Sequence, residues 1–285
     1  MNLNQLLHQK KPLIFDGALG TELSRRNLSG GIALNLNDPE PILSFHREYA
    51  AIGVDFLTTN TFTANRIYCE THGLNLDFLA ANTAAVELAR QAAGPNQYVV
   101  GDLGPTGRLL KPYGDFTEEQ FHANFAEQAA TLAAAGADAL IIETMTDLRE
   151  AVTALKACKE VTSLPVFVTL SYATTDKGGR TIMGASVAEA AAALEQNGAA
   201  AIGANCGELT PLQMAEIVAL YNSHTTLPII VQPNAGLPKL VSGKTVFEMS
   251  PADFAAGAQK CLENGASIVG GCCGTTLEHI RALIS

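Results

Sequence analysis

Three glycine-flanked cysteines are the residues of this sequence best suited to carry chemistry. Cys206 lies in IGANCGE, and Cys272 and Cys273 lie together in VGGCCGTT. Each motif ends a short apolar run of the kind that forms a buried strand. Three thiolates with a fourth position open are the layout of a catalytic zinc site, whereas a structural site is closed by four ligands. We therefore predict that these cysteines bind Zn²⁺.

The glycines matter because two of the cysteines are adjacent. Neighbouring side chains on a strand point to opposite faces, so both can bind one metal only if the chain leaves β geometry here. Gly270, Gly271 and Gly274 permit that departure. Two alternatives are plain packing, common for a free cysteine, and a redox pair, which would need a strained vicinal disulfide because C-x-x-C is absent.

The other three cysteines, Cys69, Cys158 and Cys261, have no glycine partners and fall on predicted helices or loops. We expect them to be packing residues. Six cysteines without dense regular spacing do not form the disulfide framework of a small secreted domain. Reduced thiols are therefore expected, and these can ligate metal.

Apolar runs alternate with longer Ala-rich amphipathic segments along the whole chain, which is typical of βα units around a parallel sheet. The eight runs are residues 12–15, 54–60, 98–104, 137–144, 165–172, 199–206, 228–233 and 267–271. Helical stretches include residues 118–135, 148–161, 187–197, 212–223 and 251–264. Eight βα units predict an α/β fold, a single (β/α)8 TIM barrel over residues 1–285.

A weak internal repeat indicates which residues share the mouth of this barrel. Four helix-to-strand junctions begin with a glycine: Gly53, Gly136, Gly198 and Gly265. Seven residues on stand Asn60, Glu143, Asn205 and Cys272, and eight residues on stand Thr61, Thr144, Cys206 and Cys273. Residues at equal depth on alternate strands belong to one layer, so these groups should converge at the C-terminal mouth. The irregular segments 27–37 and 108–115 should overhang the same mouth.

Composition excludes several classes of function. The chain has 47% hydrophobic and 16% charged residues, as expected of a globular enzyme. A formal net charge of -10 and the lack of any Lys/Arg cluster argue against nucleic-acid binding. No targeting segment and no apolar run of about 18 residues is visible, so we expect no membrane association and a cytoplasmic location.

An ordered set of motifs resembles the homocysteine S-methyltransferases. These motifs are DGALGTEL (16–23), TTNTF (58–62), GDLGPTG (101–107), IIET (141–144), GANC (203–206), PNAGLP (233–238) and GGCCGT (270–275). The chain looks most like the homocysteine-binding module of cobalamin-dependent methionine synthase. That resemblance implies a (β/α)8 barrel whose three cysteines bind zinc, and homocysteine as the substrate that becomes methionine. It also implies that a corrinoid donor would arrive on another protein.

Zinc would deprotonate the substrate thiol, whose pKa of about 8.5 makes it a poor nucleophile at neutral pH. Asp16 and Glu143 are the acidic residues best placed for the substrate ammonium, and the resemblance implies the same role. The alternatives are a helix N-cap for Asp16 and an ion pair within the barrel for Glu143.

The remaining predicted contacts lie near the two ends of the chain. Backbone N–H groups near Ala18 and Gly20 are expected to hold the substrate carboxylate, because small residues allow close approach. Thr21 belongs to the same substrate-binding segment. Asn234 is either a hydrogen-bonding group or interim ligand near the open zinc position, or a turn residue.

The methyl donor is the least constrained part of the function. We place a methyl-corrinoid protein first, then S-methylmethionine or S-adenosylmethionine, then betaine. Betaine is placed last because onium cages favour Trp, which is absent, although Tyr68, Tyr113 and Tyr172 remain. Two readings from other classes stay open: a zinc-binding or redox-sensing protein without transferase activity, and a zinc lyase or hydrolase, which the all-sulfur ligand set disfavours.

Overall fold

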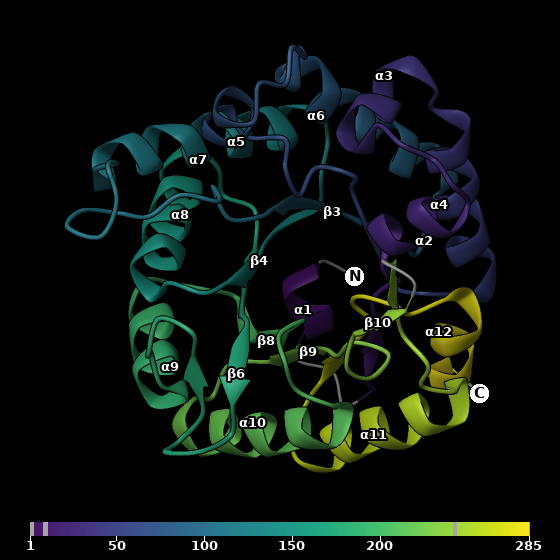
Figure 1. Cartoon of the computed structure of the whole chain (residues 1–285), viewed down its shortest axis with the longest axis vertical. Helices are drawn as coiled ribbons and strands as arrows, with labels where there is room; N and C mark the ends of the chain where they lie inside the picture. The colour runs from purple at the N-terminus through teal and green to yellow at the C-terminus, as the bar shows by residue number, and fades with distance from the viewer. Residues whose placement is uncertain (1–2, 8–10, 242–243, 285) are drawn as a thin grey trace.

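The protein is a closed barrel of parallel strands in the computed structural model, which describes residues 3–7, 11–241 and 244–284 (Figure 1). The strands lie in the order β1-β12-β9-β8-β5-β4-β3-β2, and a parallel bridge from Phe15 to Phe56 closes the ring. They are β1 (Leu13–Ile14), β2 (Phe56–Thr58), β3 (Tyr98–Leu103), β4 (Ala139–Met145), β5 (Val166–Leu170), β8 (Ala201–Asn205), β9 (Ile229–Gln232) and β12 (Ile268–Val269). The predicted (β/α)8 barrel is confirmed.

Helices form the outer ring around these strands (Figure 1). Their bounds are α2 (Leu19–Arg25), α3 (Leu34–Asn37), α4 (Glu40–Ile52), α5 (Arg66–Thr71), α6 (Phe78–Ala92), α7 (Glu118–Ala134), α8 (Leu148–Val161), α9 (Val187–Gln196), α10 (Pro211–His224), α11 (Pro251–Glu263) and α12 (Leu277–Ile284). Within the described part of the chain, no helix combines the length and hydropathy needed to cross a bilayer.

Some details differ from the sequence prediction. Most strands are shorter than the apolar runs, because the runs include loop residues at both ends. Two small hairpins follow β5 and β9: β6 (Tyr172–Thr174) with β7 (Arg180–Thr181), and β10 (Lys239–Val241) with β11 (Lys244–Val246). The segment 27–37, predicted to be irregular, contains the 3-10 turn Gly31–Ala33 and helix α3. Both helical pieces are a single turn long, too short for periodicity to reveal them.

The barrel interior is filled by side chains. Phe15, Phe56 and Phe167 meet there, with ring centroids 4.5 to 6.3 Å apart. The short helix α1 (Leu3–Leu7) packs Leu3 and Leu7 against this cluster and lies within the ring in Figure 1. The interior is therefore a packed core and not a pore.

Each of the four junction glycines lies between the end of a helix and the barrel strand that follows it. Each has a positive φ, from 80° to 112°, a conformation that glycine adopts without steric cost. Two residues after three of them, a side chain accepts a hydrogen bond from the neighbouring barrel strand that comes earlier in the sequence. Asp55 accepts a hydrogen bond from the Ile14 N–H at 2.8 Å, Asp138 one from the Val99 N–H at 2.7 Å, and Ser267 one from the Ile229 N–H at 3.2 Å. These hydrogen bonds thus fix the register of adjacent strands at the N-terminal end of the barrel.

Gly203 in β8 shows how closely adjacent strands are packed. A Cβ added there would lie 1.8 Å from the carbonyl oxygen of Ile230, which is backbone and cannot rotate away. Gly136, by contrast, has a φ of +100° but open space around its Cα.

We therefore expect Gly203→Ala to lower the free energy of unfolding by about 3 kcal/mol or more, or to prevent folding. Gly136→Ala, the matched control, should cost only about 1 to 2 kcal/mol of backbone strain. Urea unfolding followed by circular dichroism measures both. Equal losses in the two variants would contradict the packing argument.

Candidate functional site

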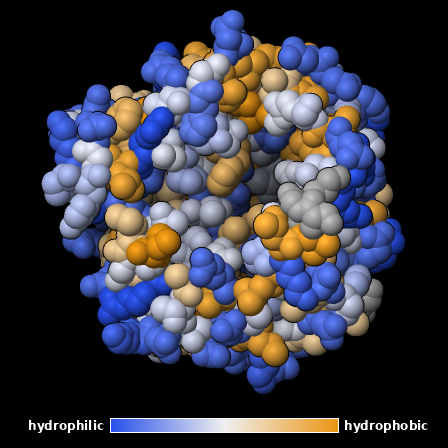
Figure 2. Space-filling model, in the orientation of Figure 1, coloured by the Kyte–Doolittle hydropathy of each residue, from blue (hydrophilic) through white to orange (hydrophobic). Residues whose placement is uncertain are grey.

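A cavity of about 600 Å³ opens at the C-terminal mouth of the barrel. The space-filling view shows a hollow at the centre of this face (Figure 2). Its wall is built by residues at or just after the C-terminal ends of the strands, among them Asp16, Thr58, Asp102, Glu143, Cys206 and Cys272. This is the end of a parallel barrel where binding residues gather.

The three predicted cysteines meet in this cavity. Their sulfur atoms all lie within 4.8 Å of one another, and the Sγ atoms of Cys206 and Cys273 are 3.8 Å apart. Three sulfurs around one tetrahedral zinc ion, each at about 2.3 Å, stand about 3.8 Å apart. The spacing of the thiol cluster therefore fits a zinc ion.

The adjacent cysteines share the cluster because the chain leaves β geometry before them. β12 ends at Val269, and Cys272 and Cys273 lie in the following turn. The Cys272 N–H donates to the Pro233 carbonyl at 2.8 Å, and the Cys273 carbonyl accepts from the Ala235 N–H at 2.9 Å. The turn is thereby tied to the loop after β9.

Two of the flanking glycines are required by close packing. A Cβ on Gly270 would lie 2.5 Å from the Cβ of Phe15, and one on Gly271 would lie 2.5 Å from the Thr275 hydroxyl. The glycines therefore allow the turn that contains Cys272 and Cys273, the cysteine turn, to pack directly against the end of β1.

Cys206 and Thr144 are held in an unusual backbone conformation. Their φ angles are 56° and 60°, in the left-handed region that residues other than glycine rarely adopt. They occupy the same position of the internal repeat. At Thr144 the register of β4 shifts, and such a bulge re-aims a side chain, here that of Glu143, toward the cavity.

Asn205 holds this strained region together. Its Oδ1 accepts from the Thr144 N–H and the Thr169 hydroxyl, both at 2.8 Å. Its Nδ2 donates to the Thr144 hydroxyl at 2.7 Å and to Glu143 at 3.3 Å, and lies 3.9 Å from the Cys272 sulfur. The repeat positions of three alternate strands, Glu143, Asn205 and Cys272, thus meet as the sequence predicts.

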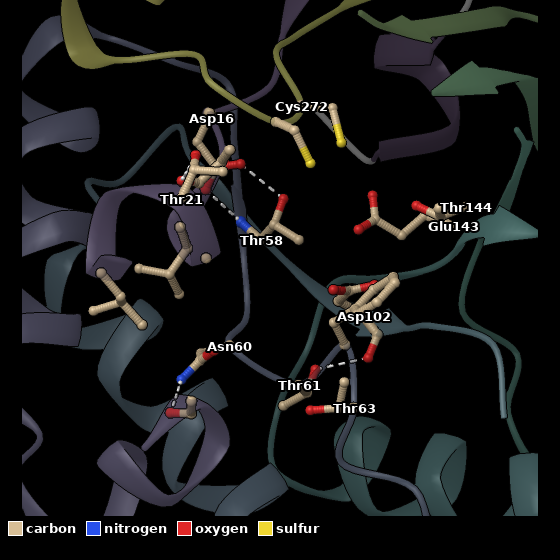
Figure 3. Close-up of a pocket in the computed structure, with 18 of the residues that line it drawn as sticks. Asp16, Thr21, Thr58, Asn60, Thr61, Thr63, Asp102, Glu143, Thr144 and Cys272 are labelled. Carbon is tan, nitrogen blue, oxygen red and sulfur yellow. Dashed lines mark hydrogen bonds between the residues drawn. The ribbon is translucent and has the colours of Figure 1, made fainter. Parts of the chain in front are cut away.

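The fourth member of the set lies apart from them. Asn60 lines the same cavity, but its Nδ2 donates to the Gly31 carbonyl and to Asn35, tying together the loops above β2. In Figure 3 it stands at the far end of the cavity from Cys272.

The thiols ionise unequally. Hydrogen bonds from Cys272 and Cys273 lower the pKa of Cys206 to about 3, with help from the Gly207 N–H and Asn234. The same interaction with Cys206 raises the pKa of Cys272 well above its usual range and that of Cys273 to about 12. One thiolate thus accepts two S–H donors, and all three can ionise together only beside a cation.

Carboxyl groups face the thiols across the cavity (Figure 3). Asp16 accepts from the Thr58 N–H and hydroxyl, both at 2.8 Å, and burial raises its pKa to about 7. Burial, together with the nearby charge of Cys206, raises the pKa of Glu143 to about 8. Burial and the Glu143 charge also raise the pKa of Asp102. Neither alternative role is seen: Asp16 caps no helix, and Glu143 pairs with no cation among the described residues.

The segment after β1 connects the cavity wall to the cysteine turn. Ala18, Gly20 and Thr21 all line the cavity at the start of α2. The Ala18 N–H donates to the Thr275 hydroxyl at 3.2 Å. The Thr21 hydroxyl donates to the Ala18 carbonyl and accepts from the Gly274 N–H, both at 3.2 Å. The Ala18 N–H therefore already has a partner within the protein, the side-chain hydroxyl of Thr275.

Asn234 lies next to the thiol cluster but does not face the cavity. It is 2% exposed, outside the cavity lining, and its Nδ2 donates to the Gly207 carbonyl at 3.0 Å. Its buried Oδ1 has no hydrogen-bond partner among the described residues. Asn234 thus supports the loop that carries Cys206, and a turn role alone does not describe it.

Several residues of this site are not predicted from the sequence. Asp102 lies in the GDLGPTG motif and Asn205 in the internal repeat, but neither pattern shows what its polar side chain does. Thr58, which holds Asp16, and Gln232, whose carbonyl accepts from the Cys206 N–H at 3.1 Å, were also missed. A polar residue at the end of an apolar run was the available signal for all four.

Comparison with known proteins gives a consistent assignment. Residues 13–285 match the family described as homocysteine S-methyltransferase. Methionine synthase of Mycobacterium leprae is 31% identical over 293 residues, which cover 95% of this chain and 24% of that protein. The methionine synthase of Mycobacterium tuberculosis shows the same identity and coverage. The chain spans about a quarter of the length of these relatives.

Solved structures share the whole fold. The homocysteine methyltransferase MmuM from Escherichia coli, in its oxidised and metallated forms, superposes with a TM-score of 0.81 at 25% identity, covering 99% of this chain and 98% of that one. The carboxyl transferase domain of Rhizobium etli pyruvate carboxylase, at 15% identity and a TM-score of 0.56 over 94% of this chain and 41% of that one, shares the fold alone. The family match over almost the whole length and the methionine synthase relatives show that this chain belongs to the homocysteine S-methyltransferase family.

Proposed function

We propose that this chain is a zinc-dependent homocysteine S-methyltransferase that makes methionine. The observation that carries the proposal is the cluster of three thiols in a cavity whose other ionisable groups are carboxyls. No Lys, Arg or His is found among the described residues that line it. Such a cavity favours a metal cation and a substrate that carries an ammonium group.

The donor set fits zinc rather than a harder cation. Sulfur ligands select zinc and other soft ions, whereas Mg²⁺ and Ca²⁺ take oxygen ligands. MmuM, solved in a metallated form, shows that a metal has been found in a related homocysteine methyltransferase. Bound zinc would deprotonate the homocysteine thiol and present its sulfur as a nucleophile, so that the protein needs no separate general base.

The chain's own residues would orient the amino-acid end of homocysteine. Glu143 and Asp16 accept the ammonium, since both carboxyls line the cavity near the thiols. The N–H groups at the start of α2, around Gly20 and Thr21, face the carboxylate, because the first N–H groups of a helix lack partners within it. Asn234 keeps Cys206 in place behind the cluster.

For the methyl donor we retain a methyl-corrinoid protein ahead of sulfonium compounds and betaine. An aromatic cage for betaine has little support, because Phe62 is the one aromatic residue among the described residues that line the cavity. Tyr172 is fully buried against Tyr221, Tyr113 is 76% exposed, and Tyr68 stacks on His72. None of these tyrosines lines the cavity. A cytoplasmic location, where the thiols stay reduced, also remains a prediction.

Zinc analysis tests the ligand set. Protein prepared under reducing conditions should contain stoichiometric zinc, and Cys206→Ser should lose most of it because two thiolates bind zinc far more weakly than three. Cys69→Ser, a buried cysteine outside the cluster, is the matched control and should keep its zinc. Atomic absorption on the three proteins gives the answer. A metal-free native protein would exclude the zinc mechanism.

A donor screen tests the transfer itself. Purified protein with homocysteine should form methionine from methylcobalamin, free or carried by a corrinoid protein, and much more slowly from S-methylmethionine or betaine. Methionine is measured by mass spectrometry, with Cys206→Ser as the control for uncatalysed transfer. Robust turnover with S-methylmethionine and none with methylcobalamin would reverse the proposed order. Zinc without turnover from any donor would favour a sensing role.

A further inference from the structure

Asp102 is a buried carboxyl for which the proposed reaction has so far no use. It lies near the end of β3, is 3% exposed, and lines the cavity. Its backbone is fixed on both sides: its N–H donates to the Thr59 hydroxyl at 3.0 Å, and its carbonyl accepts from the Thr61 hydroxyl at 2.7 Å. The position of the side chain is therefore determined by the barrel.

One oxygen of the carboxyl, the buried Oδ1, is left without a hydrogen-bond partner among the residues that the structure describes. Other buried carboxyls differ. Asp16 accepts two hydrogen bonds from Thr58, and Glu150 accepts two from Thr106. A buried carboxyl oxygen without a partner destabilises the protein, so a ligand that supplies hydrogen-bond donors would offset this cost.

The surroundings of Asp102 define the charge of such a ligand. Glu143 and Asp16 are the charged groups that act on it, and both are acidic. Asp16, Asp102 and Glu143 border one space beside Cys272 (Figure 3). With no basic side chain described in the cavity wall, the occupant must bring positive charge and N–H donors itself.

We propose that Asp102 is a specificity-determining residue that binds the ammonium group of the thiol substrate, together with Glu143 and Asp16. The inference rests on the proposed function. A primary ammonium has three N–H donors, and the cavity offers three carboxyls to accept them. Asp102 contributes more to recognition than Asp16, because both oxygens of Asp16 are already bonded to Thr58. The site thereby selects amino-acid thiols over simple thiols.

One competing role uses the same residue differently. A protonated Asp102 could donate its hydrogen to the substrate carboxylate. The two roles are separated by truncated thiols: 3-aminopropane-1-thiol keeps the ammonium but lacks the carboxylate, and 4-mercaptobutanoate keeps the carboxylate but lacks the ammonium.

The experiment measures binding of L-homocysteine and of both truncated thiols to zinc-loaded protein by isothermal titration calorimetry. Asp102→Asn keeps the shape but loses the charge, and Asp102→Ser replaces it if that variant is insoluble. We expect Asp102→Asn to weaken L-homocysteine and 3-aminopropane-1-thiol by about 10- to 100-fold, as for loss of a charged hydrogen bond. Binding of 4-mercaptobutanoate should be unchanged or tighter. Glu150→Gln, a buried carboxyl outside the cavity, should change none of the three.

The outcomes are distinguishable. Equal weakening of all three thiols, or no change, overturns the role of Asp102. Selective weakening of 4-mercaptobutanoate and L-homocysteine overturns it in favour of carboxylate binding. Zinc content is measured in every variant, so that a lost metal site is recognised. If zinc-loaded wild-type protein binds none of the thiols, the proposed function itself fails.

Discussion

The concentration of acidic groups in one cavity is the constraint on which the site depends. Three thiols and three carboxyls face a space of about 600 Å³ without a described basic side chain. Burial raises the pKa of each of these carboxyls, because charged groups are costly away from water. The arrangement is stable in ionised form only when cations occupy it. In the proposed function, a metal at the thiols and an ammonium at the carboxyls supply this positive charge.

A rigid barrel is what makes such an arrangement possible. Thr144 and Cys206 both have left-handed backbone conformations that cost about 1 to 3 kcal/mol each in isolation. Asn205 offsets this cost at Thr144 by bonding both its N–H and its hydroxyl. The same amide bonds Glu143 and approaches Cys272. A single buried side chain therefore links the carboxyl side of the cavity to the thiol side.

Much of this could be predicted from the sequence, because the barrel repeats. The junction glycines set a common register, which alone predicts that Glu143, Asn205 and Cys272 lie in one layer. Asp102 could not be predicted in this way, because it lies near the end of β3, whose apolar run is not preceded by one of the four junction glycines. The role of Asn205 could not be predicted for another reason: periodicity places a residue on a face but does not show its hydrogen-bond partners. The short helices over the mouth carry no periodic signal at all.

The two halves of the cavity are also coupled electrostatically. The charge of Cys206 is one cause of the raised pKa of Glu143, and the charge of Glu143 is in turn a cause of the raised pKa of Asp102. A dication bound at the thiols would offset the first of these charges and make ionised Glu143 less costly. Ionised Glu143 and Asp102 would then bind an ammonium more strongly. Metal and amino-acid binding should therefore reinforce one another, since each supplies the positive charge that the other's ligands require.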